Sequence, residues 1–179
     1  MIDKVEMDLR VRALKARFPY QFDGARLGLY LCAGWIGIFE KLCEDIDQAL
    51  GEDKRGFRWD QVKEKYGSAR FYFQLGAMPA DLRMDLHTEK GLLSKVVPGE
   101  DRPGSPKLTK DQLSLVKRLR KLSIEAEMAT QHSCAACGQA GDLDRSQPWI
   151  MVLCDEHKSQ RAALVKEGKD LDGISLKFD

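Results

Sequence analysis

The sequence predicts an α+β fold in which helices pack with a β-hairpin and a small metal-binding lobe follows at the C-terminus. Three observations lead to this prediction. Apolar side chains recur at helical spacing in three segments, whereas residues 57–75 alternate between apolar and polar side chains as strands do. Three cysteines and one histidine gather between residues 134 and 157, a group typical of a metal site.

Size and composition indicate an ordinary globular protein. The chain has 179 residues, of which 43% are hydrophobic and 32% charged, so one domain or one core with a small added lobe is expected. A net charge of +1 argues against a surface built throughout for nucleic acid, but a local basic face stays possible. No apolar run reaches the roughly 18 residues that a membrane span needs, and the N-terminus lacks the apolar core of a secretory signal.

Three segments carry the apolar stripe of an amphipathic helix. The first covers residues 4–18 and stops before Pro19, because the residue preceding a proline is pushed out of the α region. The second begins near residue 34 and ends at Gly51, and the third covers residues 110–130 with Thr109 as its N-cap. The short apolar segment 27–31 is a strand or a loop.

The alternating residues 57–75 predict a hairpin whose turn is Gly67–Ser68, with glycine supplying a positive φ. In that register Lys65 lies directly opposite Arg70. Residues 76–109 are the least regular part. The stretch 79–86 is expected to form a short helix, and the proline-rich residues 98–106 a surface loop. Residues 1–130 would then form an α+β body and residues 131–179 a separate lobe with a C-terminal tail.

The lobe contains a Cys-x-x-Cys-Gly knuckle at Cys134 and Cys137 and a Cys-x-x-His pair at Cys154 and His157. Four ligands of this kind suit a closed tetrahedral Zn²⁺ site. A hairpin is expected over residues 142–153 and a helix from His157 to Glu167. Knuckle, hairpin and helix together predict a treble-clef zinc finger. The odd total of five cysteines argues against a disulfide framework and for the reducing cytoplasm.

A structural role for the zinc follows from its ligand count. Catalytic zinc sites usually keep three protein ligands and an open position for water, whereas four ligands close this one. Two alternatives remain. The cysteines could be unmetallated core residues, although their paired spacing is then unexplained, and His132 could replace one of the ligands.

Two basic surfaces are candidates for binding. One is the hairpin face of Lys63, Lys65, Arg70 and Tyr72. The other lies on the basic helix 107–121 and includes four cations, Lys117, Arg118, Arg120 and Lys121. Either could meet phosphates or an acidic protein. The competing interpretation is a solvated face, with Glu64 or Glu44 neutralising one of the hairpin cations.

The ordered motifs of the chain resemble a group of small, mostly uncharacterised bacteriophage and prophage proteins. The resemblance implies a viral or prophage origin and life inside a bacterial host cell, but no established activity. The chain departs from that group by a long insert at about residues 77–106. The motifs that carry the resemblance are Gly34–Cys43, Val62–Tyr72, Ile124–Glu127, Cys134–Gly138, Trp149 and Leu153–His157.

Three functions are therefore considered. The first is a zinc-binding accessory protein of phage type, not expected to be an enzyme, that binds a host protein and could inhibit a bacterial defence system. The second is a nucleic-acid-binding zinc-finger protein that uses the basic helix 107–121 and the hairpin residues 63–72. The third is a nuclease-like zinc enzyme. It is the least favoured, because no acid or base companion accompanies the four ligands.

Overall fold

A mixed four-stranded sheet forms the centre of the protein. The computed structural model describes residues 4–24, 28–54, 56–88, 91–169, 171 and 175–178. The strands lie in the order β3-β2-β1-β8. β2 and β3 are antiparallel, β1 and β2 are parallel, and β8 returns antiparallel to β1. Their bounds are β1 Gly28–Cys32, β2 Phe57–Lys65, β3 Ser68–Leu75 and β8 Ser175–Phe178.

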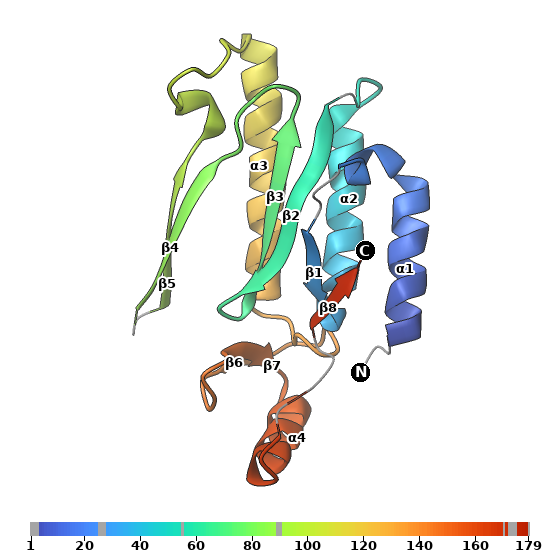
Figure 1. Ribbon diagram of the computed structural model, residues 1–179, viewed down its shortest axis with the longest axis vertical. Helices are drawn as coiled ribbons and strands as arrows, with labels where there is room; N and C mark the ends of the chain where they lie inside the picture. Colours follow the sequence, from blue (N-terminus) through green and yellow to red (C-terminus); the bar gives the residue numbers. More distant parts are fainter. Residues whose placement is uncertain are drawn as a thin grey trace.

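Helices cover one face of this sheet, which we call the inner face (Figure 1). α2 (Ile36–Leu50) and α3 (Lys110–Thr130) lie side by side on it, and α1 (Lys4–Arg17) lies beyond α2. All three predicted helices are confirmed. Thr109 caps α3 as predicted, in a reciprocal capping box with Gln112. Short 3₁₀ turns occupy Pro19–Phe22, Ala33–Trp35 and Gly99–Asp101.

Aromatic side chains fill the core between the sheet and α2. The Phe39 ring of α2 stacks on Phe71 of β3 at 5.5 Å and tilts against Trp59 of β2 at 5.5 Å. The buried Gln21 side chain accepts a hydrogen bond from the Trp59 indole and donates one to the carbonyl of Cys43. Because its polar atoms are satisfied, this glutamine joins the core without a large desolvation cost.

The predicted hairpin of β2 and β3 is confirmed, but its turn lies one residue earlier than predicted, which shifts each cross-strand partner by two residues. The turn is Tyr66–Gly67, so that Lys65 pairs with Ser68, and Lys63 rather than Lys65 lies opposite Arg70. Tyr66 has a φ of 54° and Gly67 a φ of 78°. A type I′ turn requires positive φ at both central residues. Tyrosine is unusual at the first of these positions, where asparagine, aspartate or glycine is preferred.

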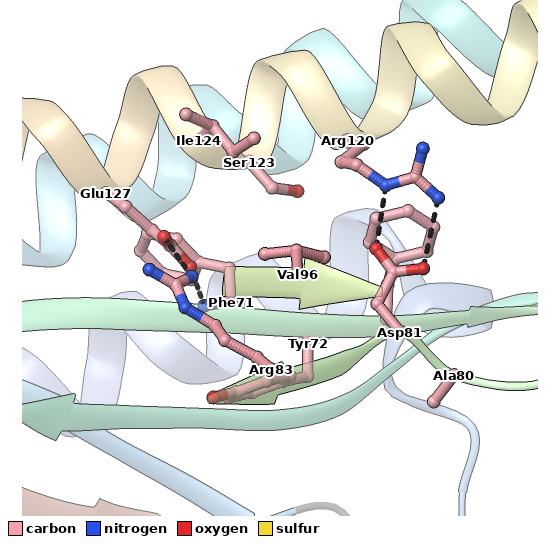
Figure 2. A pocket seen from close by; sticks show the side chains of 11 residues that line it. Phe71, Tyr72, Ala80, Asp81, Arg83, Val96, Arg120, Ser123, Ile124 and Glu127 are labelled. Atoms are coloured by element: carbon pink, nitrogen blue, oxygen red, sulfur yellow. Dashed lines mark hydrogen bonds and ion pairs between the residues drawn. The ribbon is translucent and has the colours of Figure 1, made fainter. Parts of the chain in front are cut away.

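Residues 76–109 contain a second hairpin, so the short helix expected over residues 79–86 is wrong. β4 (Leu82–Thr88) pairs antiparallel with β5 (Gly91–Val97) in a separate two-stranded sheet. Two-stranded ribbons are seldom stable alone, and ion pairs hold this one against the body. Arg83 of β4 pairs with Glu127 of α3, and Asp81, which directly precedes β4, pairs with Arg120 of α3 (Figure 2).

Side chains of α3 protect the free edge of β3. The backbone N–H of Ala69 donates to the Thr130 hydroxyl at 2.9 Å, and that of Phe71 to the Glu127 carboxylate at 3.0 Å. An unpaired strand edge would otherwise be open to pairing with another chain.

The C-terminal part forms a small lobe and then rejoins the sheet. β6 (Asp142–Asp144) pairs with β7 (Met151–Leu153), and α4 (Asp155–Lys166) follows directly. β8 then pairs with β1, an element that the sequence analysis did not predict for the C-terminal tail. No helix in the described part of the chain has both the length and the apolarity needed to cross a membrane.

Candidate metal centre

The predicted ligands Cys134, Cys137, Cys154 and His157 come together in one cluster. One ligand atom from each lies within 4.8 Å of all the others. The first two belong to the knuckle after α3, Cys154 is the N-cap of α4, and His157 lies in its first turn. Cys137 is half-buried and the other three are buried. The residues converge because the β6–β7 hairpin brings the chain back to the knuckle.

The spacing within the cluster is compatible with a metal ion such as zinc. A tetrahedral zinc with usual bond lengths separates two sulfurs by about 3.8 Å and a sulfur from a nitrogen by about 3.6 Å. The Sγ atoms of Cys137 and Cys154 are 3.9 Å apart, and the Sγ of Cys134 lies 3.6 Å from the Nδ1 of His157. The Sγ of Cys154 is closer to that nitrogen, at 3.1 Å.

The protein environment lowers the pKa of Cys134. Burial opposes ionisation of this side chain, but hydrogen bonds from the backbone at Cys154, Ala136 and Cys137 hold its pKa below the ordinary value. Burial, together with the neighbouring sulfurs, raises the pKa of Cys137 to about 11. Metal binding would deprotonate all three thiols, so protons would compete with the ion.

The knuckle is seated on the start of α2 by close backbone contacts. A Cβ at Gly34 would lie 2.2 Å from the carbonyl oxygen of Cys134 and 2.5 Å from the nitrogen of Gly138. The N–H of Gly34 donates to the carbonyl of Ala135 at 2.8 Å, and the Trp35 indole donates to that of Ser133 at 2.8 Å. Only glycine at position 34 allows this approach.

His132 is outside the cluster and is not a substitute ligand in this arrangement. It lines a shallow hollow beside Cys154 together with the carboxylates of Asp142 and Asp155. All three of these hydrophilic side chains are exposed.

Of the cations in the two predicted basic surfaces, some are buried in ion pairs and others are accessible. Arg70 is fully buried and pairs with Asp85 at 3.3 Å, so its prediction as part of an exposed face is wrong. Its neutralising partner is neither Glu64 nor Glu44, because β4 brings Asp85 over β3. Arg120 is half-buried and pairs with Asp81 and Glu100, and the hydrogen bond to Asp81 above all raises its pKa.

The remaining candidates are accessible. Lys117, Arg118 and Lys121 are exposed on α3, and Lys121 lies 3.7 Å from Glu125. Lys63, Lys65 and Tyr72 are half-buried on the sheet face opposite the helices.

An exposed apolar group that was not predicted from the sequence lies where the lobe meets the β2–β3 turn. We call it the junction patch: Tyr66, Leu143 and Trp149, exposed by 42%, 39% and 45%. The indole of Trp149 donates to one oxygen of Glu64 at 3.1 Å, and the N–H of Gly67 donates to the other at 2.7 Å. Tyr66 and Trp149 belong to the motifs that carry the resemblance. Their proximity was not predictable, because Glu64 and Trp149, whose contact brings them together, are far apart in the sequence.

A cavity between α3, β3 and the β4–β5 hairpin lies between two ion pairs, Arg83–Glu127 and Arg120–Asp81 (Figure 2). Its volume is about 40 Å³, enough for one or two water molecules but not for a substrate.

Comparisons with protein-family models, with curated proteins and with solved structures each found no match. The class of the protein is therefore described from its fold and its site alone. It is an α+β protein with a C-terminal Cys₃His group compatible with a metal ion such as zinc.

Proposed function

We propose that Cys134, Cys137, Cys154 and His157 bind one Zn²⁺ in a closed structural site. Four ligands of suitable type and spacing support this proposal. The knuckle, the β6–β7 hairpin and α4 would then form a treble-clef lobe. Because the knuckle also contacts Gly34, zinc binding would contribute to the stability of the body as well as of the lobe.

The same proposal gives the protein a binding function: it recognises another protein through the junction patch. The observation that carries this is the pair of exposed aromatic side chains, Tyr66 and Trp149, beside Leu143. Tyrosine and tryptophan dominate the energetic centres of protein interfaces, because each buries a large area while losing little conformational freedom.

The patch is held in place before any partner arrives. The carboxylate of Glu64 joins the Trp149 indole to the β2–β3 turn. Arg161 donates to the Trp149 carbonyl at 2.7 Å and pairs with Asp144 at 3.1 Å. A Cβ at Gly67 would lie 2.7 Å from the Leu143 side chain, so the turn packs directly on the lobe. Such preorganisation lowers the entropic cost of binding.

The backbone of Tyr66 supports the same proposal. A tyrosine in the left-handed region is strained, and asparagine or glycine would suit this turn position better. Strain of this kind is concentrated at functional sites. The resemblance to phage and prophage proteins suggests a host-cell protein as the partner, and inhibition of a defence protein is one form that binding could take.

Nucleic-acid binding through the basic helix has less support. Asp81 and Glu100 neutralise Arg120, leaving Lys117, Arg118 and Lys121 as the exposed cations among the four candidates on α3. The nuclease-like alternative gains no support from the cluster, where four ligands leave no position for a reacting water.

Site-specific photo-crosslinking in a bacterial host tests the proposed surface. A photoreactive residue would replace Tyr66 or Leu143 in separate variants, and Leu9, which is 60% exposed on α1, provides the matched control. Both patch positions should capture the same host protein, and position 9 should not. Trp149→Ala should then weaken binding of the purified pair at least about tenfold. Equal capture from all three positions, or none from the patch, would contradict the proposal.

A further inference from the structure

The sheet face opposite α2 and α3 is a second surface, distinct from the junction patch. Along β1, β2 and β3, alternate side chains such as Leu29, Val62 and Phe71 point to the helices and are buried. The intervening residues lie on the other face, which Figure 1 shows uncovered by α1, α2 or α3. On β3, however, Ser68 and Arg70 of this face are buried, and Asp85 of β4 pairs with Arg70. We call this the outer face and define it by five residues: Tyr30, Gln61, Lys63, Lys65 and Tyr72.

An aromatic ring lies along this face. Tyr30 is 40% exposed. A Cβ at Gly28 would lie 3.7 Å from the Cε2 of Tyr30 and 3.8 Å from the side chain of Gln61. The ring therefore extends back over Gly28 rather than standing away from the sheet. At 40% exposure, part of the ring is accessible to a stacking base.

The outer face has an excess of positive charge. Lys63 lies 5.2 Å from the centre of the Tyr72 ring and pairs with no carboxylate among the described residues. Lys65 lies 3.7 Å from Asp85 and is 37% exposed. Below them, the buried guanidinium of Arg70 leaves its Nη2 without a hydrogen-bond partner.

Acidic side chains do little to offset this charge. The described parts of β1, β2 and β3 contain two carboxylates, Asp60 and Glu64. Glu64 shares the alternation of Val62 and pairs with the buried Ala69, so it belongs to the inner face, and Asp60 is exposed. Asp85 of β4 also reaches the outer face, but its side chain is 1% exposed and is shared by three cations, Lys65, Arg70 and Arg83. The accessible charge on the face is therefore positive, and its partner should be an anion.

The strand register places the ring beside the cations. Leu29 is the register partner of Val62, so Tyr30 lies next to Lys63 on the adjacent strand. Neighbouring strands are about 4.8 Å apart, and residues two positions apart on one strand are separated by about 6.6 Å. Lys63 and Lys65 thus form a short row of positive charge that starts beside Tyr30.

We propose that the outer face binds single-stranded nucleic acid, with a base stacked on Tyr30 and successive phosphates at Lys63 and Lys65. Sequence-tolerant single-strand sites combine such an aromatic surface with cations that follow the backbone. An acidic protein fits less well, because the five residues of the outer face include no aliphatic side chain that could anchor an apolar protein surface.

Fluorescence anisotropy of a labelled oligothymidine with the full-length, zinc-loaded protein tests this proposal. Binding should weaken with salt, with a log–log slope of about −1.4 for two phosphate contacts. Tyr30→Ala should reduce affinity at least about fivefold, whereas Tyr30→Phe should preserve it. Lys63→Gln should reduce the steepness of the slope by about 0.7. Lys41→Gln, at an exposed lysine of α2, is the matched control and should change neither quantity.

Three results would overturn the proposal. The first is no binding at about 50 mM salt, where two phosphate contacts are least screened. The second is an affinity that Tyr30→Ala and Lys63→Gln leave unchanged while both variants keep the parent's melting temperature. The third is displacement of the oligothymidine by oligoglutamate at equal charge, which would assign the face to an acidic protein instead.

Discussion

Replacing Tyr66 by asparagine separates a role in binding from a role in folding. The substitution produces Asn-Gly, the preferred pair for a type I′ turn, at a position where φ is 54°. It also removes the aromatic ring that is 42% exposed in the junction patch. If Tyr66 served only the fold, deleting its side chain should not increase the stability of the protein.

The expected magnitude follows from two opposing effects. Relief of the left-handed strain should stabilise the protein by about 1 kcal/mol. Loss of the contact between Lys65 and the Tyr66 ring, at 5.3 Å, should cost about 0.5 kcal/mol at this exposed site. The net gain of about 0.5 kcal/mol corresponds to a rise in melting temperature of about 1–2 °C for a chain of this size.

Two measurements check the outcome. Differential scanning calorimetry should show a melting temperature equal to or slightly above that of the parent. Binding to the crosslinked partner should fall by at least tenfold, about 1.4 kcal/mol. A fall of several degrees would refute the turn assignment, and unchanged affinity would refute the junction patch as the binding surface. Leu9→Asn provides the control for loss of an exposed apolar side chain elsewhere.

Three further predictions concern the framework. Gly34→Ala should destabilise the protein by more than about 3 kcal/mol in denaturant unfolding. Gly37→Ala, whose Cβ would meet nothing closer than 3.7 Å, is the control and should be neutral or stabilising. Equal effects of the two substitutions would contradict the close packing of the knuckle on Gly34. Glu127→Leu should cost about 1–3 kcal/mol, because the buried N–H of Phe71 loses its acceptor and Arg83 loses this carboxylate while keeping Asp85, and an unchanged stability would contradict these contacts. Arg120→Met should speed limited proteolysis within residues 76–109 about tenfold with little change in melting temperature, and an unchanged cleavage pattern would show that ion pairs do not hold the β4–β5 hairpin.

Elements with a strong local signal were predictable from the sequence. The stripes of α1, α2 and α3 and the Thr109 cap specify their helices within a few residues, because both signals depend on neighbours three and four positions apart. The four-residue metal cluster was equally predictable. Its two pairs have the spacing that a tetrahedral ion demands, and a hairpin suffices to bring them together.

The errors arose where contacts distant in sequence decide the outcome. Residues 82–86, which belong to β4, gain a strand conformation from pairing with β5, and ion pairs to α3 hold the resulting ribbon. The burial of Arg70 depends on the same ribbon, because Asp85 comes from β4. No local pattern around Arg70 contains this information.

The turn register was missed for a different reason. Glycine was assigned to the first turn position, but Gly67 takes the second and Tyr66 accepts a positive φ. The bond from the Gly67 N–H to Glu64 and the packing of Gly67 against Leu143 favour this arrangement. A bulge between Trp59 and Gln61 interrupts the alternation along β2, so that Phe57, Trp59 and Val62 all point into the core.

X-ray absorption spectroscopy of the purified protein, combined with elemental analysis, tests the proposed closed zinc site most directly. A closed site requires one zinc per chain, coordinated by three sulfurs at about 2.3 Å and one nitrogen at about 2.0–2.1 Å. Cys154→Ser should reduce both the zinc content and the stability of the protein. Absence of zinc, or a shell with fewer protein ligands and a bound water, would contradict the closed structural site at Cys134, Cys137, Cys154 and His157.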